Sequence, residues 1–158
     1  MSKNVLKDQN FASWIYIART RDAIVKNRVK ELNNFDLSIR QCTILMVLDA
    51  LGENSTPAEL SRWVFREQHS ISDFLKRMER DGLIRRVKDL DRKNMIRVTI
   101  TEKGRKAVHD IKKLGSIRKI MSSLTKEEHQ QLRAILEKLW DKALEELGIN
   151  KRPIFPSS

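Results

Sequence analysis

TPAELSRWVFREQHSISDFLKRMERDGLIRRVKDLDRKNMIRVTITEKG, residues 56–104, carries the signals for two helices that follow one another closely. The first begins with a capping box, Thr56 to Glu59, and has proline at its first helical position. A second helix is predicted over 68–81, where apolar residues recur at three-, four- and seven-residue spacings. Gly82 then favours a helix end, because glycine tolerates the left-handed conformation found there.

Two short strands follow, over 84–88 and 95–100. The second alternates at period two, which predicts inward-facing Ile96, Val98 and Ile100, and outward-facing Arg97 and Thr99. The segment between the strands is strongly charged, as the tip of an exposed hairpin would be. Two helices, a turn and a hairpin in this order predict a winged helix-turn-helix, a fold that is mainly α with a small β-hairpin wing.

The second helix has the polar face of a DNA reader. Amide and hydroxyl side chains at the start of this helix can hydrogen-bond to base edges. The cationic side chains one or two turns later can contact phosphates. The candidate major-groove residues are Gln68, Ser70, Ser72, Asp73, Lys76 and Arg77. The alternative is an ordinary solvated face. The wing is expected to contact DNA through Arg86, Lys88, Arg92 and Lys93, since the minor groove attracts cations. Contacts to the DNA backbone are expected at the starts of helices, from Ser38, Arg40 and Thr56.

The charge distribution agrees with a polyanionic partner. The 158 residues carry a net charge of +11, and 40% of them are apolar. Residues 61–105 hold thirteen basic and seven acidic side chains, the densest basic segment of the chain. Such a concentration over the predicted reader favours nucleic acid as the partner, against the alternative of a merely solubilising surface.

Several other classes of function find little support. A single cysteine, Cys42, excludes an intramolecular disulfide and a cysteine-rich zinc site. Cys42 is expected to be a small core residue rather than a redox sensor, for which Arg40 would be the one nearby cation. His69, His109 and His129 are scattered, and there is no glycine-rich phosphate loop, so we expect no enzyme activity, metal or cofactor. Without a signal peptide or a membrane-length apolar run, the protein is expected to be cytoplasmic and free of membrane contact.

Amphipathic helices flank the predicted reader. One is expected over 10–33, and one begins at a capping box, Ser38 to Gln41. After Thr101 a helix continues through Gly115, which marks either a bend or a close helix crossing. A third capping box, at Thr125, begins the last helix, and the tail over 149–158 is either frayed or clipped onto a partner.

The flanking helices carry more apolar surface than the compact middle of the chain can cover. The first could pack on its own C-terminal helix or on a partner chain, and a two-fold dimer solves this burial problem. Its two readers would then lie about 34 Å apart and meet an inverted repeat. The predicted organisation is one chain, 1–158, with a winged core at 36–101, dimerisation arms at 10–34 and 102–148, and the tail at 149–158.

Motifs spread over residues 10–147 resemble the multiple antibiotic resistance regulator (MarR) family. They are Leu37-Ser38-Ile39-Arg40-Gln41, Glu59-Leu60-Ser61, Ile71-Ser72, Arg77-Met78-Glu79, Asp81-Gly82-Leu83-Ile84-Arg85, Asp91-Arg92-Lys93 and Val98-Thr99-Ile100-Thr101-Glu102-Lys103-Gly104. The resemblance implies a dimeric transcriptional regulator, usually a repressor, whose DNA affinity often falls when a small aromatic ligand or an oxidant acts.

The resemblance also carries roles to single positions. Arg77 matches a family arginine on the helix that lies in the major groove. Family members usually have the wing arginine two residues after the aspartate, where this chain has Lys93, so either Arg92 or Lys93 enters the minor groove. Asp73 departs from the basic residue of many relatives, and Cys42 does not match the N-terminal cysteine of the peroxide sensors.

We therefore expect a sequence-specific, double-stranded DNA-binding regulator, a homodimeric repressor on an inverted-repeat operator. A small aromatic effector would enter a crevice between the terminal helices and the winged core, with Trp14 and Tyr16 in its lining, although Trp14 also suits the core. The alternative is a winged-helix protein-interaction module, which the acidic Asp73 and the Trp63 and Phe65 pair would favour.

Overall fold

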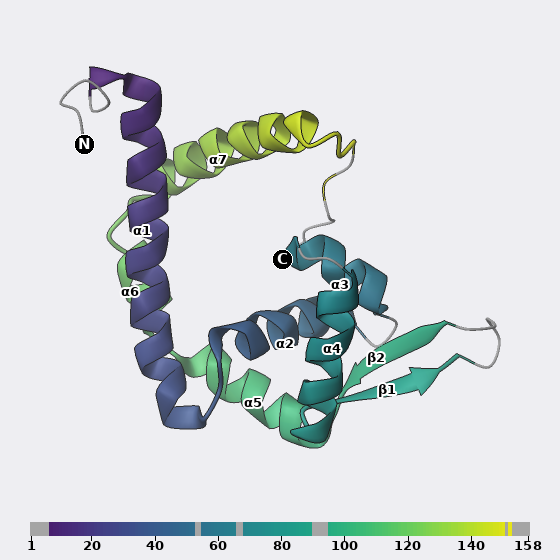
Figure 1. Cartoon of the computed structure of the whole chain (residues 1–158). Helices are drawn as coiled ribbons and strands as arrows, with labels where there is room; N and C mark the ends of the chain where they lie inside the picture. Colours follow the sequence, from purple (N-terminus) through teal and green to yellow (C-terminus); the bar gives the residue numbers. More distant parts are fainter. Residues whose placement is uncertain (1–6, 53–54, 66–67, 90–94, 151, 153–158) are drawn as a thin grey trace.

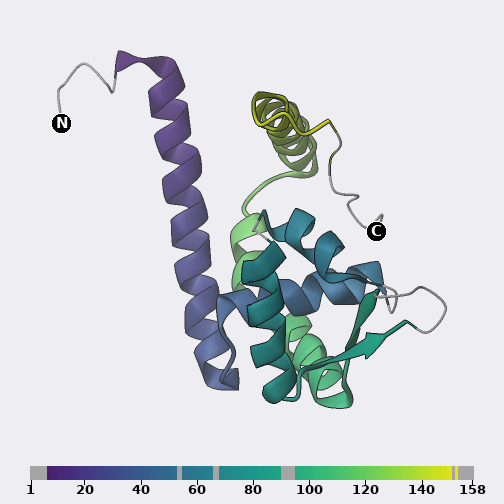
Figure 2. The same ribbon diagram turned by 45° about the vertical axis from the view of Figure 1, so that its right-hand side comes forward.

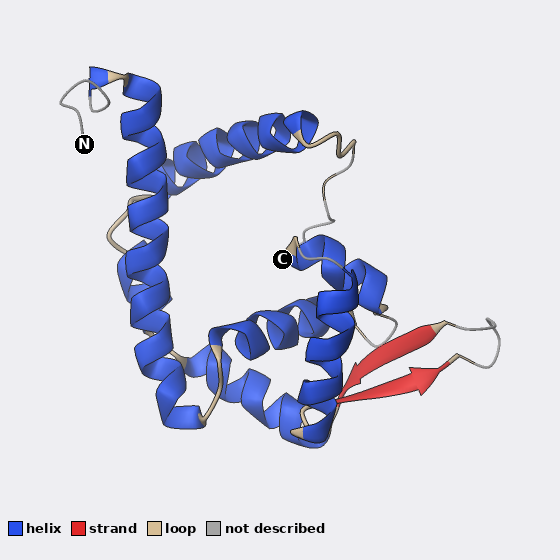
Figure 3. Ribbon diagram, in the orientation of Figure 1, coloured by secondary structure: helices blue, strands red, loops and turns tan. Residues whose placement is uncertain are grey.

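The computed structural model describes residues 7–52, 55–65, 68–89, 95–150 and 152 (Figure 1). Within these ranges the chain is mainly helical, with one antiparallel hairpin (Figure 3). The elements in chain order are α1 (Gln9–Leu32), the 3₁₀ turn η2 (Asn33–Phe35), α2 (Ile39–Leu51), α3 (Pro57–Val64), α4 (Gln68–Arg80), β1 (Ile84–Lys88), β2 (Ile96–Ile100), α5 (Glu102–Lys113), α6 (Ser116–Met121) and α7 (Lys126–Glu146). This arrangement confirms the predicted fold class.

Helices α2, α3, α5 and α7 begin where the sequence predicts. Ser38, Thr56 and Thr125 each accept a hydrogen bond from the backbone three residues on and complete a reciprocal capping box. Thr101 caps α5 by accepting from the Gly104 backbone N–H at 3.1 Å. These bonds satisfy backbone donors that the first helical turn leaves unpaired.

One core joins the helix-turn-helix to the hairpin. β1 pairs with β2 in a register that places Ile84 opposite Ile100 and Val87 opposite Arg97. Val98 is fully buried, and its N–H donates to the Ser55 carbonyl at 2.8 Å, which ties the hairpin to the segment before α3. The remaining core is formed by Leu32, Leu37, Cys42, Ile44, Leu45, Leu48, Leu60, Ile71, Phe74, Leu75, Met78, Leu83, Ile84, Val108 and Ile111.

The predicted alternation of inward- and outward-facing side chains in β2 holds for Val98 but only in part for its neighbours. Ile96 and Ile100 are half-buried. Arg97, predicted to face outward, has a side chain only 28% exposed, because its guanidinium pairs with Asp89 at 2.6 Å. The Asp89 side chain is itself 8% exposed, so the alternation rule missed an ion pair at the outer end of the two strands.

The long helix expected after Thr101 is interrupted. α5 ends at Lys113, Leu114 has extended backbone angles, and α6 begins at Ser116. A Cβ placed on Gly115 would meet nothing within 4 Å. Of the two roles open for Gly115, the structure therefore shows the bend and not the close crossing.

The outer helices leave the core (Figures 1 and 2). α1 packs along α6, while the last helix, α7, projects separately, and both carry uncovered apolar side chains. Trp14 is 63% exposed, which corrects the expectation that it could belong to the core of its own chain. In the described part of the chain, no helix combines the length and apolar character needed to cross a bilayer.

Gly104 occupies a position that admits no side chain. A Cβ there would lie 2.1 Å from the Leu83 carbonyl oxygen and 2.6 Å from Cγ2 of Ile100. We expect Gly104→Ala to lower the free energy of unfolding by about 1–3 kcal/mol, the usual cost of overpacking. Denaturant unfolding at one fixed protein concentration measures the change.

Gly115→Ala is the matched control, since its Cβ would enter open space. This variant should stay within about 0.5 kcal/mol of the parent chain. Equal stability of the two alanine variants would show that the start of α5 tolerates a side chain at position 104.

Candidate nucleic-acid interface

α4 exposes the face that the sequence predicts as the reader. Ile71, Phe74, Leu75 and Met78 are buried against the core. On the other side Gln68, Asp73, Lys76 and Arg77 are exposed, and Ser70 and Ser72 are half-buried. The structure therefore gathers all the candidate major-groove residues on one accessible face of one helix.

Two cations from different helices share one aromatic ring. The Arg40 guanidinium lies 5.1 Å from the centroid of the Phe74 ring, and that of Arg77 lies 5.6 Å from it. Both side chains are exposed. Cation–π attraction to Phe74 positions these two charges beside the reading face, where DNA phosphates would lie.

Asp73 and Lys76 form an exposed ion pair on α4, with 3.3 Å between Nζ and Oδ1. The Asp73 side chain is 70% exposed, so the pair adds little to stability. The carboxylate nevertheless stands on the reading face, as the sequence indicated, and offsets part of its positive charge.

The helix-start hydroxyls are already engaged. The Ser38 hydroxyl donates to Oε1 of Gln41 at 3.0 Å, and the Thr56 hydroxyl donates to Oε2 of Glu59 at 3.0 Å. Their contact with the DNA backbone stays a prediction, and the structure assigns their side chains to the caps. Arg40, in the first turn of α2, carries the free charge at this end of the interface.

The wing is fastened to the reading helix by one carboxylate. Glu79 of α4 accepts from the Arg86 backbone N–H at 2.7 Å and from its Nε at 2.8 Å. The backbone bond from Arg86, aided by that guanidinium and by Arg85, lowers the pKa of Glu79 despite partial burial. The side chain of Arg86 is turned to Glu79, and its predicted contact with DNA stays a prediction.

The other predicted wing residues divide into two groups. Lys88, at the end of β1, is exposed. Arg92 and Lys93 lie outside the described residues, so the choice between them stays open.

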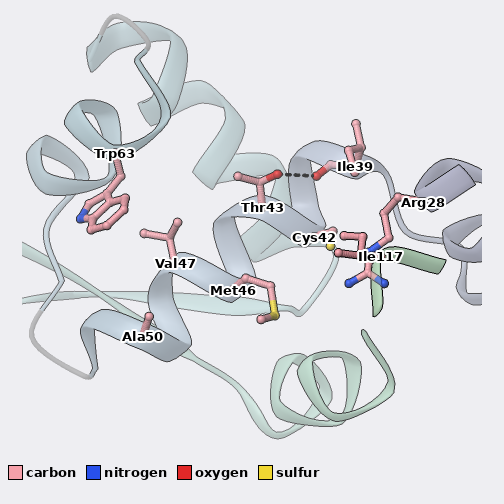
Figure 4. A pocket seen from close by; sticks show the side chains of 9 residues that line it. All are labelled: Arg28, Ile39, Cys42, Thr43, Met46, Val47, Ala50, Trp63 and Ile117. Atoms are coloured by element: carbon pink, nitrogen blue, oxygen red, sulfur yellow. Dashed lines mark hydrogen bonds between the residues drawn. The ribbon is translucent and has the colours of Figure 1, made fainter. Parts of the chain in front are cut away.

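A groove of about 400 Å³ lies between α1, α6 and the winged core (Figure 4). Its floor is one stripe of α2, and Arg28 is the only charged residue among those described in its wall. The lining residues are Arg28, Ile39, Cys42, Thr43, Met46, Val47, Ala50, Trp63 and Ile117.

Trp14 and Tyr16, the expected effector lining, do not line this groove, and Tyr16 is 75% exposed on α1. Their contact with an effector stays a prediction. Cys42 is a buried wall residue, and burial raises the pKa of its thiol although Arg28 opposes the shift. A protonated, buried thiol fits the expectation of a structural cysteine.

Sequence reasoning missed Glu79 and Arg28. Glu79 pairs with Arg86 across the turn after α4, and Arg28 lines a groove formed by helices that are distant in sequence, so no helical or strand spacing indicates these roles. The residues that the structure describes contain no group of three or more His, Cys, Asp or Glu side chains able to hold a metal ion.

Comparisons with known proteins agree with this geometry. The family model described as "Winged helix DNA-binding domain" matches residues 37–104. The organohalide-sensing transcriptional regulator RdhR-CbdbA1625, solved with 2,4-dichlorophenol bound, is 30% identical to this chain. That alignment covers 100% of this chain and 95% of the other, with a TM-score of 0.85.

More distant structures share the fold. A MarR family protein from Bacillus stearothermophilus is 26% identical with a TM-score of 0.65, over 86% of this chain and 96% of its own. A cysteine-to-serine mutant of MarR from E. coli, complexed with operator DNA, is 18% identical with a TM-score of 0.73, over 87% and 99% of the two chains. No curated protein matches the sequence. Taken with the reading helix, the wing and the flanking helices, these similarities show that the chain belongs to the MarR family of winged-helix transcriptional regulators.

Proposed function

We propose that this DNA-binding transcriptional regulator is a homodimeric repressor that recognises an inverted-repeat operator and is released by a small aromatic effector. The observation that carries the proposal is the exposed polar face of α4, flanked by Arg40 and Arg77 on the Phe74 ring. A preformed row of donors with fixed cations at its side suits a major groove bordered by phosphates.

The outer helices support the two-fold assembly. On α1 the uncovered apolar side chains include Phe11, Trp14 and Ile17, and on and after α7 they are Leu132, Ile135, Leu136, Leu139, Leu147 and Ile149. Apolar rows of this length on two projecting helices suit burial against a second copy. A dimer formed in this way presents two reading helices to successive major grooves.

Within each half-site the residues would divide the work. Gln68, Ser70 and Ser72, in the first turns of α4, would read base edges. The Asp73 carboxylate repels phosphates but accepts from the cytosine amino group, which narrows the operator. The wing would add its own contact in the minor groove through Arg92 or Lys93.

The groove along α2 is the proposed effector site. Its 400 Å³ and its apolar wall suit a small aromatic molecule. The 30% identical regulator was solved with 2,4-dichlorophenol, which makes chlorinated phenols a first class of compounds to test.

The two aromatic residues that would favour the protein-interaction alternative have contacts within the chain. Trp63 is half-buried in the groove wall, and Phe65 packs edge-on against Trp140 with 6.4 Å between ring centroids. Phe65 is nevertheless 48% exposed, and the Asp73 side chain is on the surface, so this alternative stays open.

Arg40→Ala and Arg77→Ala should each weaken operator binding by about tenfold and reduce the salt slope of binding by about one, since each removes a phosphate contact. Fluorescence anisotropy on the DNA flanking the protein's own gene, over a range of salt concentrations, measures both effects. Arg133→Ala, which removes an exposed arginine on α7, is the control and should leave both values unchanged. If Arg40→Ala and Arg77→Ala both keep the affinity and the salt slope of the parent chain, these two cations do not contact DNA.

Glu79→Gln should weaken DNA binding several-fold, because the wing loses the charge-assisted bonds that hold it on α4. Simple electrostatics predicts the opposite, since the substitution removes a negative charge near DNA. Asp73→Asn removes a carboxylate that does not hold the wing, and this variant should bind non-operator DNA more strongly. Tighter operator binding by both variants would contradict the role of Glu79 in holding the wing on α4.

The same ion pair has a defined pH dependence. Because the folded-state pKa of Glu79 lies below its ordinary value of 4.5, the carboxylate stabilises the fold above that value. The stability difference between the parent chain and Glu79→Gln should be full at neutral pH and shrink as pH falls from 4.5 through the lower folded-state pKa. Denaturant unfolding of both proteins across this window tests it, and a difference that grows in acid would contradict the assignment.

A further inference from the structure

The C-terminal tail folds back onto α7. Gly148, just after the helix, has a left-handed φ of 69°, which lets the chain reverse its direction. Arg152 then donates from Nε and Nη2 to the two carboxylate oxygens of Asp141, and from Nη2 to the Glu137 carbonyl at 3.2 Å. A guanidinium and a carboxylate that are joined by two bonds hold a defined geometry. This part of the tail is therefore fastened to its own helix.

The same guanidinium lies over an aromatic ring. Cζ of Arg152 is 5.7 Å from the centroid of the Trp140 ring. Trp140 in turn meets Phe65 edge-on, with 6.4 Å between the ring centroids and 63° between the ring planes. Both contacts have an attractive geometry. Arg152, Trp140 and Phe65, the α7 stack, therefore link the tail and α7 to the turn that follows α3.

α7 stands largely clear of the winged core. Leu144 is the one residue of this fully described helix that is buried. In Figures 1 and 2 the C-terminal half of α7 passes over α3, on the side of the core away from α5. Because so little of α7 is covered, the α7 stack has a large share in joining this helix to the reading unit.

Phe65 occupies the turn that sets the direction of the reading helix. It is the C-cap of α3, with left-handed backbone angles (φ 49°, ψ 52°), and α4 begins shortly afterwards at Gln68. A bulky side chain is rarely found at such angles, because its Cβ crowds the neighbouring carbonyl oxygen. Such a conformation persists only where surrounding contacts support it. The Trp140 ring provides a contact of this kind.

We propose that Trp140 is a positioning residue for DNA reading: held by Arg152, its ring keeps Phe65 in the left-handed turn and so fixes α4 against α3. Trp140 acts through Phe65 and does not touch DNA. This role depends on DNA binding by α4, and it requires neither an effector nor a particular operator sequence. In the proposed function α7 serves the dimer, and here a second face of the same helix serves the reading unit.

Substitutions of Phe65 separate the turn from the ring contact. Asparagine tolerates left-handed angles and leucine does not, and Phe65 is 48% exposed, so neither residue disturbs the core. Trp140→Leu and Phe65→Leu should each weaken operator binding about three- to tenfold, the range expected for an aromatic contact. Phe65→Asn should bind like the parent chain. A chain carrying both Phe65→Asn and Trp140→Leu should recover the parent affinity.

The salt dependence of binding separates positioning from loss of the dimer. None of these substitutions removes a phosphate contact, so the salt slope should keep its parent value in each variant, whereas separated copies would give a lower slope. Fluorescence anisotropy on the DNA flanking the protein's own gene measures the affinity and the slope. Unchanged affinity of Trp140→Leu, failure of Phe65→Asn to restore binding, or a lower slope in Trp140→Leu would each overturn the positioning role.

Arg152→Gln covers the case in which the other variants do not fold, since Arg152 follows the last helix. The Phe65 amide donates to the Ser61 carbonyl, and its hydrogen exchange should be faster in Arg152→Gln than in the parent chain. Arg133→Gln, which removes an exposed cation elsewhere on α7, is the matched control and should leave this exchange unchanged. Equal exchange in Arg152→Gln and the parent chain would also overturn the positioning role.

The repressor and the positioning role fail separately. If the parent chain binds all DNA sequences equally, the repressor falls, and exchange at the Phe65 amide still tests the α7 stack. If the parent chain binds its operator and Trp140→Leu binds it equally well, the repressor stands and the positioning role falls.

Discussion

Three successive backbone carbonyls at the end of the reading helix hold the structure together. The Asp81 carbonyl accepts from Nζ of Lys103 at 2.7 Å, that of Gly82 from the Thr101 hydroxyl at 2.6 Å, and that of Leu83 from the Thr101 N–H at 3.1 Å. Reader, wing and arm meet at these bonds, and Gly104 keeps the space clear that they require. Because three elements are tied at one point, the position of α5 fixes the direction in which α4 and the hairpin are presented.

The interface is built on this junction by charges that are held in advance. Phe74 positions two arginines, and Glu79 fastens β1 to α4, so the cations and the wing need little reordering when DNA arrives. Pre-positioned groups bind with a smaller loss of conformational entropy, which favours affinity. A net charge of +11 attracts DNA over a long range, and the arrangement of individual side chains determines where the DNA binds.

Local chemistry made much of the fold predictable. The capping boxes at Ser38, Thr56 and Thr125 depend on residues three apart, so the sequence alone was sufficient to place those helix starts. The polar face of α4 followed from its period. The surface that covers Trp14 was not predictable, because an amphipathic pattern indicates that a face needs burial and not which surface provides it. Arg28 was invisible for the same reason: its role depends on helices far away in the sequence.

In the proposed dimer, two copies of this chain read an inverted repeat with a fixed separation between the reading helices. Affinity for the selected operator should be compared with affinity for the same operator carrying five extra base pairs between its half-sites, which turns one half-site to the opposite side of the duplex. Binding should fall toward the non-specific level, a loss of roughly 10³-fold or more. Unchanged affinity after the insertion would contradict it, because a rigid two-fold reader cannot reach both half-sites.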